Sequence, residues 1–243
     1  MAQKRISKKE QERLAALAAR RRRRAGYVVL AVVGLALILG EVINLSGVSL
    51  GLPFGGGKAA SQSLTNPEAP LASFYTPEVK HWQPEIQRWA REYGVNPNVI
   101  AIVIQIESCG NPVALSGAGA VGLMQVMPFH FDNGQNMLDP DVNVQRGMSV
   151  FYECLTQFSG WDLGLALACY NGGPGVTQQD YQNWAPETQY YYRWATGLWD
   201  DMIKGRKTSA VLSEWLAAGG KGLCERAALA LSTTALETSP NPP

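Results

Sequence analysis

The sequence predicts a mainly α-helical domain with a small β-hairpin beside a cleft, preceded by one membrane-spanning helix. Three observations support this prediction. An almost uncharged apolar run lies near the N-terminus, apolar residues recur at helical spacing from Trp82 onward, and a stretch rich in Gly and Pro interrupts that pattern between residues 110 and 135. The overall composition, 46% hydrophobic and 17% charged, is typical of a globular protein.

The N-terminal segment combines a basic tail with an apolar run. Residues 1 to 24 contain ten Lys or Arg and two Glu, whereas residues 25 to 243 contain eleven Lys or Arg and eighteen Asp or Glu. From Ala25 to Gly57 the only charged residue is Glu41, so we expect a transmembrane anchor at 26–46. Because positively charged residues flanking a membrane span stay on the cytoplasmic side, the tail at 1–25 should be cytoplasmic. The chain after the anchor should lie on the outer side of the cytoplasmic membrane.

Two other interpretations of this segment remain open. The strictly apolar part, from Ala25 to Gly40, is short enough for a cleaved signal peptide, although no clear small-residue cleavage site follows it closely. The arginine run is also compatible with a nucleic-acid-binding arm. We expect no nucleic-acid partner, because the position of the arginine run beside an apolar segment already explains the run.

The cysteines indicate the compartment rather than a metal site. Cys109, Cys154, Cys169 and Cys224 lack C-x-x-C spacing, and His81 and His130 lie far apart in the sequence, so no metal is expected. An even number of cysteines on the exported side favours one or two disulfides. All three pairings remain possible, and buried free thiols are the alternative.

Downstream of the anchor, the sequence divides into a linker and a series of helices. Residues 47–80 are rich in Gly, Pro, Ser and Ala and are expected to form a flexible stalk. The helical domain is expected at 81–203 and a C-terminal helical extension at 204–243. Expected helices cover 82–93, 97–108, 141–158, 162–169, 187–204 and 209–217, with a possible further helix after Gly222.

Glu107 is the main candidate for a catalytic residue. The helix at 97–108 is apolar nearly all round and is therefore expected to be buried, yet it ends in Glu107 immediately before a Gly-rich loop. A carboxylate there opposes the helix dipole, and burial raises the pKa of a carboxyl group. The alternative is a surface acid that happens to end a helix. The next acid in the following loop is Asp132, so a glycoside-cleaving site here would contain one carboxylate instead of the usual two.

Four short motifs resemble the catalytic domain of soluble lytic transglycosylases, which are relatives of goose-type lysozyme. They are Glu107-Ser108 with Ser116 nine residues after Glu107, Gly-Ala-x-Gly-Leu-Met-Gln-x-Met-Pro at 119–128, Cys-Tyr-Asn-Gly-Gly-Pro-Gly at 169–175, and Glu187-Thr188 with Tyr191. The resemblance covers roughly residues 82 to 200. It implies an α+β lysozyme-like fold, peptidoglycan strands as the substrate and no cofactor. It also implies a bacterial protein whose domain lies on the periplasmic or extracellular side.

The resemblance also implies a reaction. A lone glutamate, here Glu107, protonates the bridge oxygen between N-acetylmuramic acid and N-acetylglucosamine. As a carboxylate it then takes the proton of the muramoyl C6 hydroxyl, which closes a 1,6-anhydro ring. An internal nucleophile replaces both the second carboxylate and the bound water.

The same resemblance assigns substrate-binding roles, each with a structural alternative. Ser116 would bond the N-acetyl group of the muramoyl unit or merely form a turn. Gln125 and Met127 would line the cleft or merely pack in the hairpin. Asn171 would contact the sugar or the acid, or merely cap a helix. Tyr170 would flank Glu107, and Tyr191 would orient it, with a register error among the consecutive Tyr190, Tyr191 and Tyr192 as the main risk. His130 is expected to be a structural or cleft-rim residue.

Three functions follow from these observations. The first is a membrane-anchored lytic transglycosylase. The second is a lysozyme-type hydrolase on the same fold. The third, of another class, is an inactive wall-binding scaffold module.

Overall fold

The computed structural model describes residues 63–238, with side chains up to residue 233. The tail at 1–25 and the anchor expected at 26–46 lie outside the described residues. Within the described range, no helix is both long enough and apolar enough to cross a membrane.

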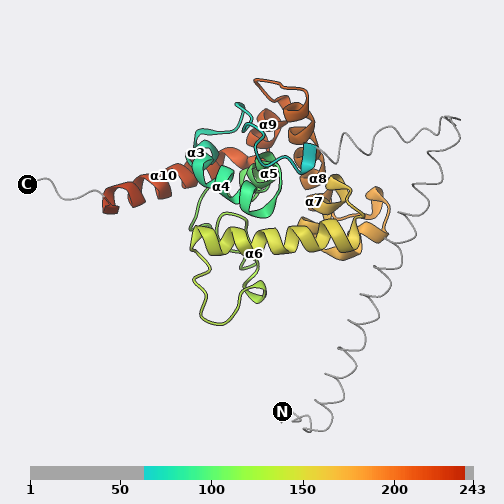
Figure 1. Ribbon diagram of the computed structural model, residues 1–243, viewed down its shortest axis with the longest axis horizontal. Coiled ribbons are helices and arrows are strands. Elements are labelled where there is room, and N and C mark those ends of the chain that lie inside the picture. Colours follow the sequence, from blue (N-terminus) through green and yellow to red (C-terminus); the bar gives the residue numbers. More distant parts are fainter. Residues whose placement is uncertain (1–62, 239–243) are drawn as a thin grey trace, which may run out of the picture. The chain divides into compact units, whose positions relative to one another are not determined.

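The described chain is mainly helical, as predicted (Figure 1). The α-helices are α3 (Pro77–His81), α4 (Gln83–Tyr93), α5 (Pro97–Glu107), α6 (Pro140–Glu153), α7 (Leu163–Gly172), α8 (Pro186–Ile203), α9 (Ala210–Trp215) and α10 (Lys221–Thr238). Short 3-10 turns occur at η1 (Pro128–His130), η3 (Pro174–Gln178) and η4 (Tyr181–Asn183), and π-helical turns at η2 (Cys154–Phe158) and η5 (Leu216–Gly220).

Helix α5 is the central element and contacts α3, α4 and α8 (Figure 1). Its start follows from sequence, because the Asn96 side chain accepts a hydrogen bond from the Asn98 backbone N–H and Pro97 occupies the first turn. Every residue from Pro97 to Ile106 is buried. Each fully buried Ile side chain contributes about 1.5–3 kcal/mol, so burial holds α5 firmly in place.

The loop between α5 and α6 contains no β-hairpin, so that prediction is wrong. It has only isolated bridges, Leu115 with Val121 and Val121 with Val126. The backbone turns too often for strands to extend, since Gly119, Gly122 and Gln125 all have positive φ angles.

The segment expected to be a flexible stalk is packed against the helices over its described part, 63–80. Leu64, Phe74, Tyr75 and Val79 are buried in the common core. The Asn96 backbone N–H donates to the Leu64 carbonyl at 2.7 Å. The folded unit therefore begins before residue 81, because these apolar side chains find partners that the linker-like composition of the segment does not reveal.

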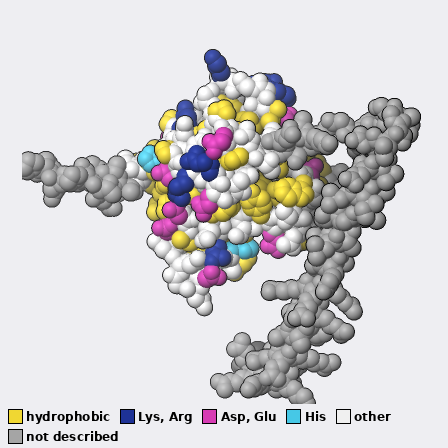
Figure 2. Space-filling model, viewed as in Figure 1, with side chains coloured by type: hydrophobic (Ala, Val, Ile, Leu, Met, Phe, Trp, Pro, Cys, Tyr) yellow, Lys and Arg dark blue, Asp and Glu magenta, His cyan; other side chains and the backbone are white. Residues whose placement is uncertain are grey.

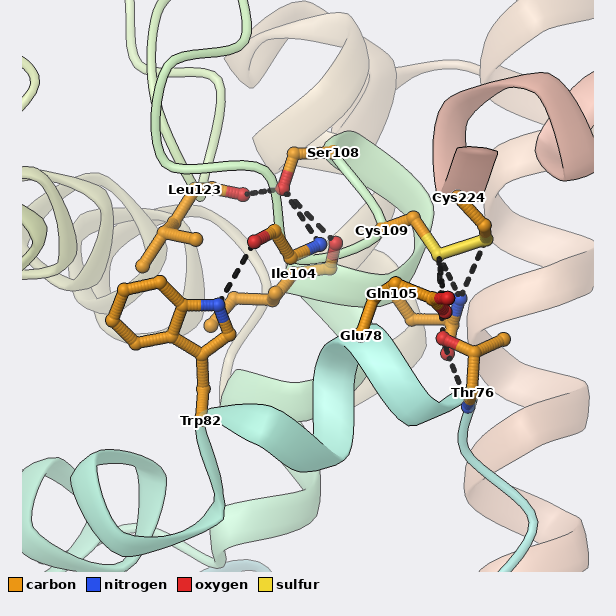
Figure 3. Close-up of a disulfide and its surroundings, with 10 residues drawn as sticks. Thr76, Glu78, Trp82, Ile104, Gln105, Ser108, Cys109, Leu123 and Cys224 are labelled. Atoms are coloured by element: carbon orange, nitrogen blue, oxygen red, sulfur yellow. Dashed lines mark hydrogen bonds between the residues drawn. A yellow bond between two sulfur atoms is a disulfide. The ribbon is translucent and has the colours of Figure 1, made fainter. Parts of the chain in front are cut away.

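The four cysteines form two disulfides, which excludes the alternative of free thiols. Cys154 is bonded to Cys169, joining η2 to α7. Cys109 is bonded to Cys224, with a Cα–Cα distance of 4.9 Å, and this bond fixes α10 beside the end of α5 (Figure 3).

Buried polar groups of Thr76, just before α3, and of Gln105, on α5, surround the Cys109–Cys224 disulfide. The Gln105 side-chain nitrogen donates to the Cys109 sulfur at 3.2 Å, and the Gln105 side-chain oxygen accepts from the Thr76 backbone N–H at 3.2 Å (Figure 3). The residues expected to form a C-terminal extension, 204–243, are thus joined to the central helix by a covalent bond over their described part.

Candidate active site

Two adjoining cavities, with volumes of about 710 and 420 Å³, meet at Glu107. Six residues line both cavities: Glu107, Ser116, Gly117, Gln125, Asn171 and Glu187. The cavities therefore form one open cleft, and Glu107 lies where they join. A chain-like ligand could extend to both sides of this carboxyl group.

The end of α5 is held so that Glu107 faces this cleft. Ser108, which follows it, is buried, and its hydroxyl donates to the Leu123 carbonyl at 2.7 Å and accepts from the Gly110 backbone N–H at 3.1 Å (Figure 3). Ser108 thus ties the helix end to the loop that forms one wall of the cleft.

The environment of Glu107 favours its protonated form. Loss of hydration is the largest cause and raises the pKa of the carboxyl group from 4.5 to about 8, and the negative charge of Glu187 adds to the rise. Interaction with the Tyr191 hydroxyl opposes it. Near neutral pH, Glu107 can therefore donate a proton to a leaving oxygen and then accept one.

Tyr191 is the tyrosine that the structure places beside Glu107. It is 3% exposed and lines the larger cavity, whereas Tyr190 is 51% exposed and stacks on Trp194. Tyr192 packs against Trp184. The buried Tyr191 hydroxyl has no partner of normal hydrogen-bond geometry among the described residues, so it is available to the Glu107 carboxylate.

Ser116 and Gln125 line both cavities and also shape the loop. The Ser116 hydroxyl accepts from the Ala120 backbone N–H at 2.9 Å, as expected for a turn-forming serine. The Gln125 side-chain nitrogen donates to the carbonyls of Gly122 and Ala114, at 3.0 and 3.3 Å. Its side-chain oxygen has no partner within the described chain and is the atom left for a ligand.

Tyr170 and Asn171, at the end of α7, border the smaller cavity. The Tyr170 hydroxyl donates to the Met124 carbonyl at 2.7 Å, and burial together with the charge of Glu107 raises the pKa of this phenol. The Asn171 side-chain oxygen accepts from the Thr188 hydroxyl at 2.9 Å. The Asn171 amide nitrogen bonds to no other described residue, which leaves a donor facing the cleft.

Met127 lines the far part of the smaller cavity, where its side chain is half-buried. His130 lies beyond it in η1, against the exposed ring of Phe129, and lines neither of the two cavities. All seven residues expected to act in catalysis or substrate binding thus border the cleft, whereas His130 lies outside it.

Three residues of the site were missed as functional candidates from the sequence. Glu187, in the first turn of α8, brings a second carboxylate to the cleft. Asn143 is buried on α6 and holds the loop through the Met124 backbone N–H and the Val121 carbonyl, both at 2.9 Å. Gly122 approaches it so closely that a β-carbon would lie 2.3 Å from the Asn143 side-chain nitrogen. The spacing of these three residues in the sequence carries no signal for such contacts.

The C-terminal helices were also not expected to reach the cleft. Trp215, Gly219, Gly220, Leu223 and Arg226 form the wall of the larger cavity opposite the loop. The disulfide, whose pairing the sequence left open, and the packing of α9 on α8 and of α10 on α3 bring this segment there.

Metal binding finds no support in the described residues. The one group with metal-ligand spacing is Glu78 with Cys109 and Cys224. Its two sulfur atoms are joined in the disulfide and do not offer thiolates.

A helical domain with a desolvated carboxyl group in an open cleft has an arrangement that suits general acid catalysis. Comparison with known proteins identifies the domain: residues 84–191 match the family model described as Transglycosylase SLT domain. Residues 84–191, a little under half of the chain, therefore match a transglycosylase SLT domain, and the resemblance inferred from the four motifs is confirmed.

Curated relatives also match part of the chain. A protein of Enterobacteria phage PRD1 named transglycosylase is 37% identical over 112 residues, covering 45% of this chain and 40% of the phage protein. An endo-type membrane-bound lytic murein transglycosylase A of Klebsiella pneumoniae is 41% identical over 63 residues, covering 26% of this chain and 29% of that protein. The chain thus spans less than half the length of these relatives.

Solved structures give a more distant match. The soluble lytic transglycosylase of 70 kDa from Escherichia coli is 24% identical, with a TM-score of 0.43, and the match covers 54% of this chain and 26% of that one.

Proposed function

We propose that the chain is a membrane-anchored lytic transglycosylase that cuts the β-1,4 bond between N-acetylmuramic acid and N-acetylglucosamine in peptidoglycan. The anchor at 26–46 would hold the domain on the outer side of the bacterial cytoplasmic membrane, with the N-terminus inside. The matched SLT domain and relatives named as membrane-bound lytic murein transglycosylases support this proposal.

The observation that carries the proposal is the position and protonation of Glu107. The carboxyl group lies where the two cavities join, so a glycan strand bound through both would place one glycosidic oxygen near it. Its pKa of about 8 means that the acid form dominates at neutral pH. A protonated carboxyl group is what the departing sugar oxygen needs.

The proposed reaction uses Glu107 twice. The Glu107 proton passes to the glycosidic oxygen as the bond from muramoyl C1 to that oxygen breaks, and the N-acetylglucosamine unit leaves with a free hydroxyl. The Glu107 carboxylate then takes the proton of the muramoyl C6 hydroxyl while the C6 oxygen bonds to C1. The carboxyl group is regenerated, no water is consumed, and the product ends in a 1,6-anhydro ring.

A lysozyme-type hydrolase is the second candidate, and Glu187 is the observation that favours it. This carboxylate lines both cavities and interacts electrostatically with Glu107. A second carboxylate could activate a water molecule for attack on the sugar. We favour the transglycosylase for two reasons. Glu187 is exposed on the rim, where bulk water hydrates its carboxylate, and the matched domain is named for transglycosylation.

The desolvated state of the Glu107 carboxyl group argues against an inactive scaffold module. Keeping a carboxyl group desolvated at a helix end costs stability, and a module that only binds the wall gains nothing from that cost. Glu107 in the cleft therefore supports catalysis.

Replacement of the acid tests the proposal. Glu107→Gln should lower the rate of release of anhydro-ended fragments from peptidoglycan by at least about 1,000-fold, because the amide cannot donate the proton. Glu153→Gln, at an exposed glutamate of α6, is the matched control and should cleave like the wild type. Wild-type cleavage by Glu107→Gln would contradict the assignment of the acid.

A further inference from the structure

The larger cavity has a wall that lies outside the matched domain. The match ends at residue 191, whereas Trp215, Gly219, Gly220 and Arg226 line this cavity from α9, η5 and α10. Substrate bound there would touch a part of the chain that the family model does not cover.

This wall depends on two adjacent glycines. Gly219 has a φ angle of +124°, a conformation that L side chains rarely adopt. At Gly220, a β-carbon would lie 2.4 Å from the Trp215 ring. The turn between α9 and α10 can therefore close over Trp215 only because neither residue has a side chain.

Arg226 gives this wall its charge. Of the residues that line the two cavities, it is the only Lys or Arg, and it belongs to the larger cavity alone. Its guanidinium lies back over Gly222, where a β-carbon would be 3.6 Å from Nη1. Arg226 forms no ion pair with any carboxylate of the described side chains, unlike Arg88, Arg146 and Arg193.

The disulfide determines where this charge lies. Cys224 precedes Arg226 by two residues and is bonded to Cys109, which follows Glu107 by two residues. The distance between the guanidinium and the carboxyl group is thereby limited by two short segments and a covalent bond. Arg226 therefore lies on a helix that is covalently fixed beside the end of α5 and lines the same cavity as Glu107, and it is not a cation on a freely moving tail.

We infer that Arg226 and the turn at 219–220 form a subsite for the carboxylates of the peptide carried by N-acetylmuramic acid. This inference rests on the proposed function. An unpaired guanidinium suits a carboxylate because its parallel N–H groups match the two oxygens. In a peptide-bearing strand the sugars carry neutral hydroxyl, N-acetyl and lactyl-amide groups, whereas the attached peptide carries free carboxylates.

The other charged residues of the larger cavity also support a carboxylate-binding role for Arg226. Glu107 and Glu187 are the acidic residues that line the larger cavity. The Glu187 carboxylate would repel an anionic peptide approaching its side of the cleft, and Arg226 offsets this repulsion. The enzyme should therefore prefer peptide-bearing strands over bare ones.

The test compares the full-length chain on three soluble glycan substrates: strands with peptides, strands with the peptide carboxylates amidated, and strands whose peptides are removed and whose lactyl carboxylates, freed by that removal, are amidated. The readout is the ratio of kcat/KM between peptide-bearing and peptide-free strands. Arg226→Ala should lower this ratio about 10-fold, the effect of losing one hydrogen-bonded charge pair. Arg226→Lys should retain part of it, and amidation should reduce the preference of the wild type in the same way.

Lys221→Ala is the matched control, since it removes one positive charge from the same helix outside the cleft and should leave the ratio unchanged. An unchanged ratio in Arg226→Ala, or an equal loss on all three substrates, would overturn the inference. Failure of the wild type to release anhydro-ended products from any substrate would instead overturn the proposed function, so the two failures are distinguishable.

Discussion

Cys109 and Cys224, which are 115 residues apart in the sequence, are bonded directly behind the cleft and join the end of α5 to α10. The bond places the acid-bearing helix and the C-terminal wall in one unit. Both stability and substrate binding should therefore depend on it.

Removal of this disulfide should destabilise the domain. The double variant Cys109→Ser/Cys224→Ser is expected to lose about 2–5 kcal/mol of unfolding free energy, because a long loop is no longer closed in the unfolded chain. Urea denaturation measures the loss. Cys154→Ser/Cys169→Ser, whose bond spans 15 residues, is the comparison and should lose less. A larger loss in the second variant would contradict the structural importance given to the first bond.

The rate of cleavage should fall as the pH rises through about 8, because the free enzyme needs Glu107 protonated. The negative charge of Glu187 contributes to the raised pKa, so Glu187→Gln should move this alkaline limb of kcat/KM to lower pH. The pH profiles of the two proteins, measured at one ionic strength, check this. A shift to higher pH would mean that the charge of Glu187 does not act on Glu107.

The same raised pKa predicts a pH-dependent stability. Between pH 4.5, where the unfolded carboxyl group ionises, and about 8, the folded state holds a proton that the unfolded state has lost. Stability should therefore fall with rising pH across this window, by at most about 1.4 kcal/mol per pH unit from this one group. Chemical denaturation of Glu107→Gln should show a gain over the wild type that grows from pH 5 to pH 8. A gain independent of pH would contradict the raised pKa.

The cleft loop should not tolerate a side chain at Gly122. Gly122→Ala would place its β-carbon 2.3 Å from the Asn143 side-chain nitrogen at a φ angle of +75°. We expect a loss of at least about 2 kcal/mol in thermal or urea unfolding, together with reduced cleavage. Gly175→Ala is the control, since its nearest neighbour would be 3.9 Å away. Equal stability of the two variants would show that the loop can rearrange.

Local patterns in the sequence predicted the helices and the raised pKa of Glu107 well. Asn96, Pro97 and an unbroken apolar run define α5 with its buried surroundings, and those surroundings explain the raised pKa of Glu107. The prediction of a β-hairpin was wrong because positive φ angles at Gly122 and Gln125 turn the backbone before strands can extend.

Contacts between distant segments could not be predicted in this way. The packing of 63–80, the reach of Asn143 into the loop and the position of Arg226 all depend on where helices meet. The pairing of Cys109 with Cys224 is one of three possibilities that the sequence treats alike. Glu187 reaches the cleft through the packing of α8 on α5, which no spacing in its own motif records.

The central claim is that Glu107 acts alone, first as acid and then as base, and that Glu187 takes no part in bond formation. The most direct measurement is mass spectrometry of peptidoglycan fragments released in water enriched with oxygen-18, by the wild type and by Glu187→Gln. We expect 1,6-anhydro ends without label from both proteins. Labelled reducing ends from the wild type, lost in Glu187→Gln, would contradict it and establish the hydrolase.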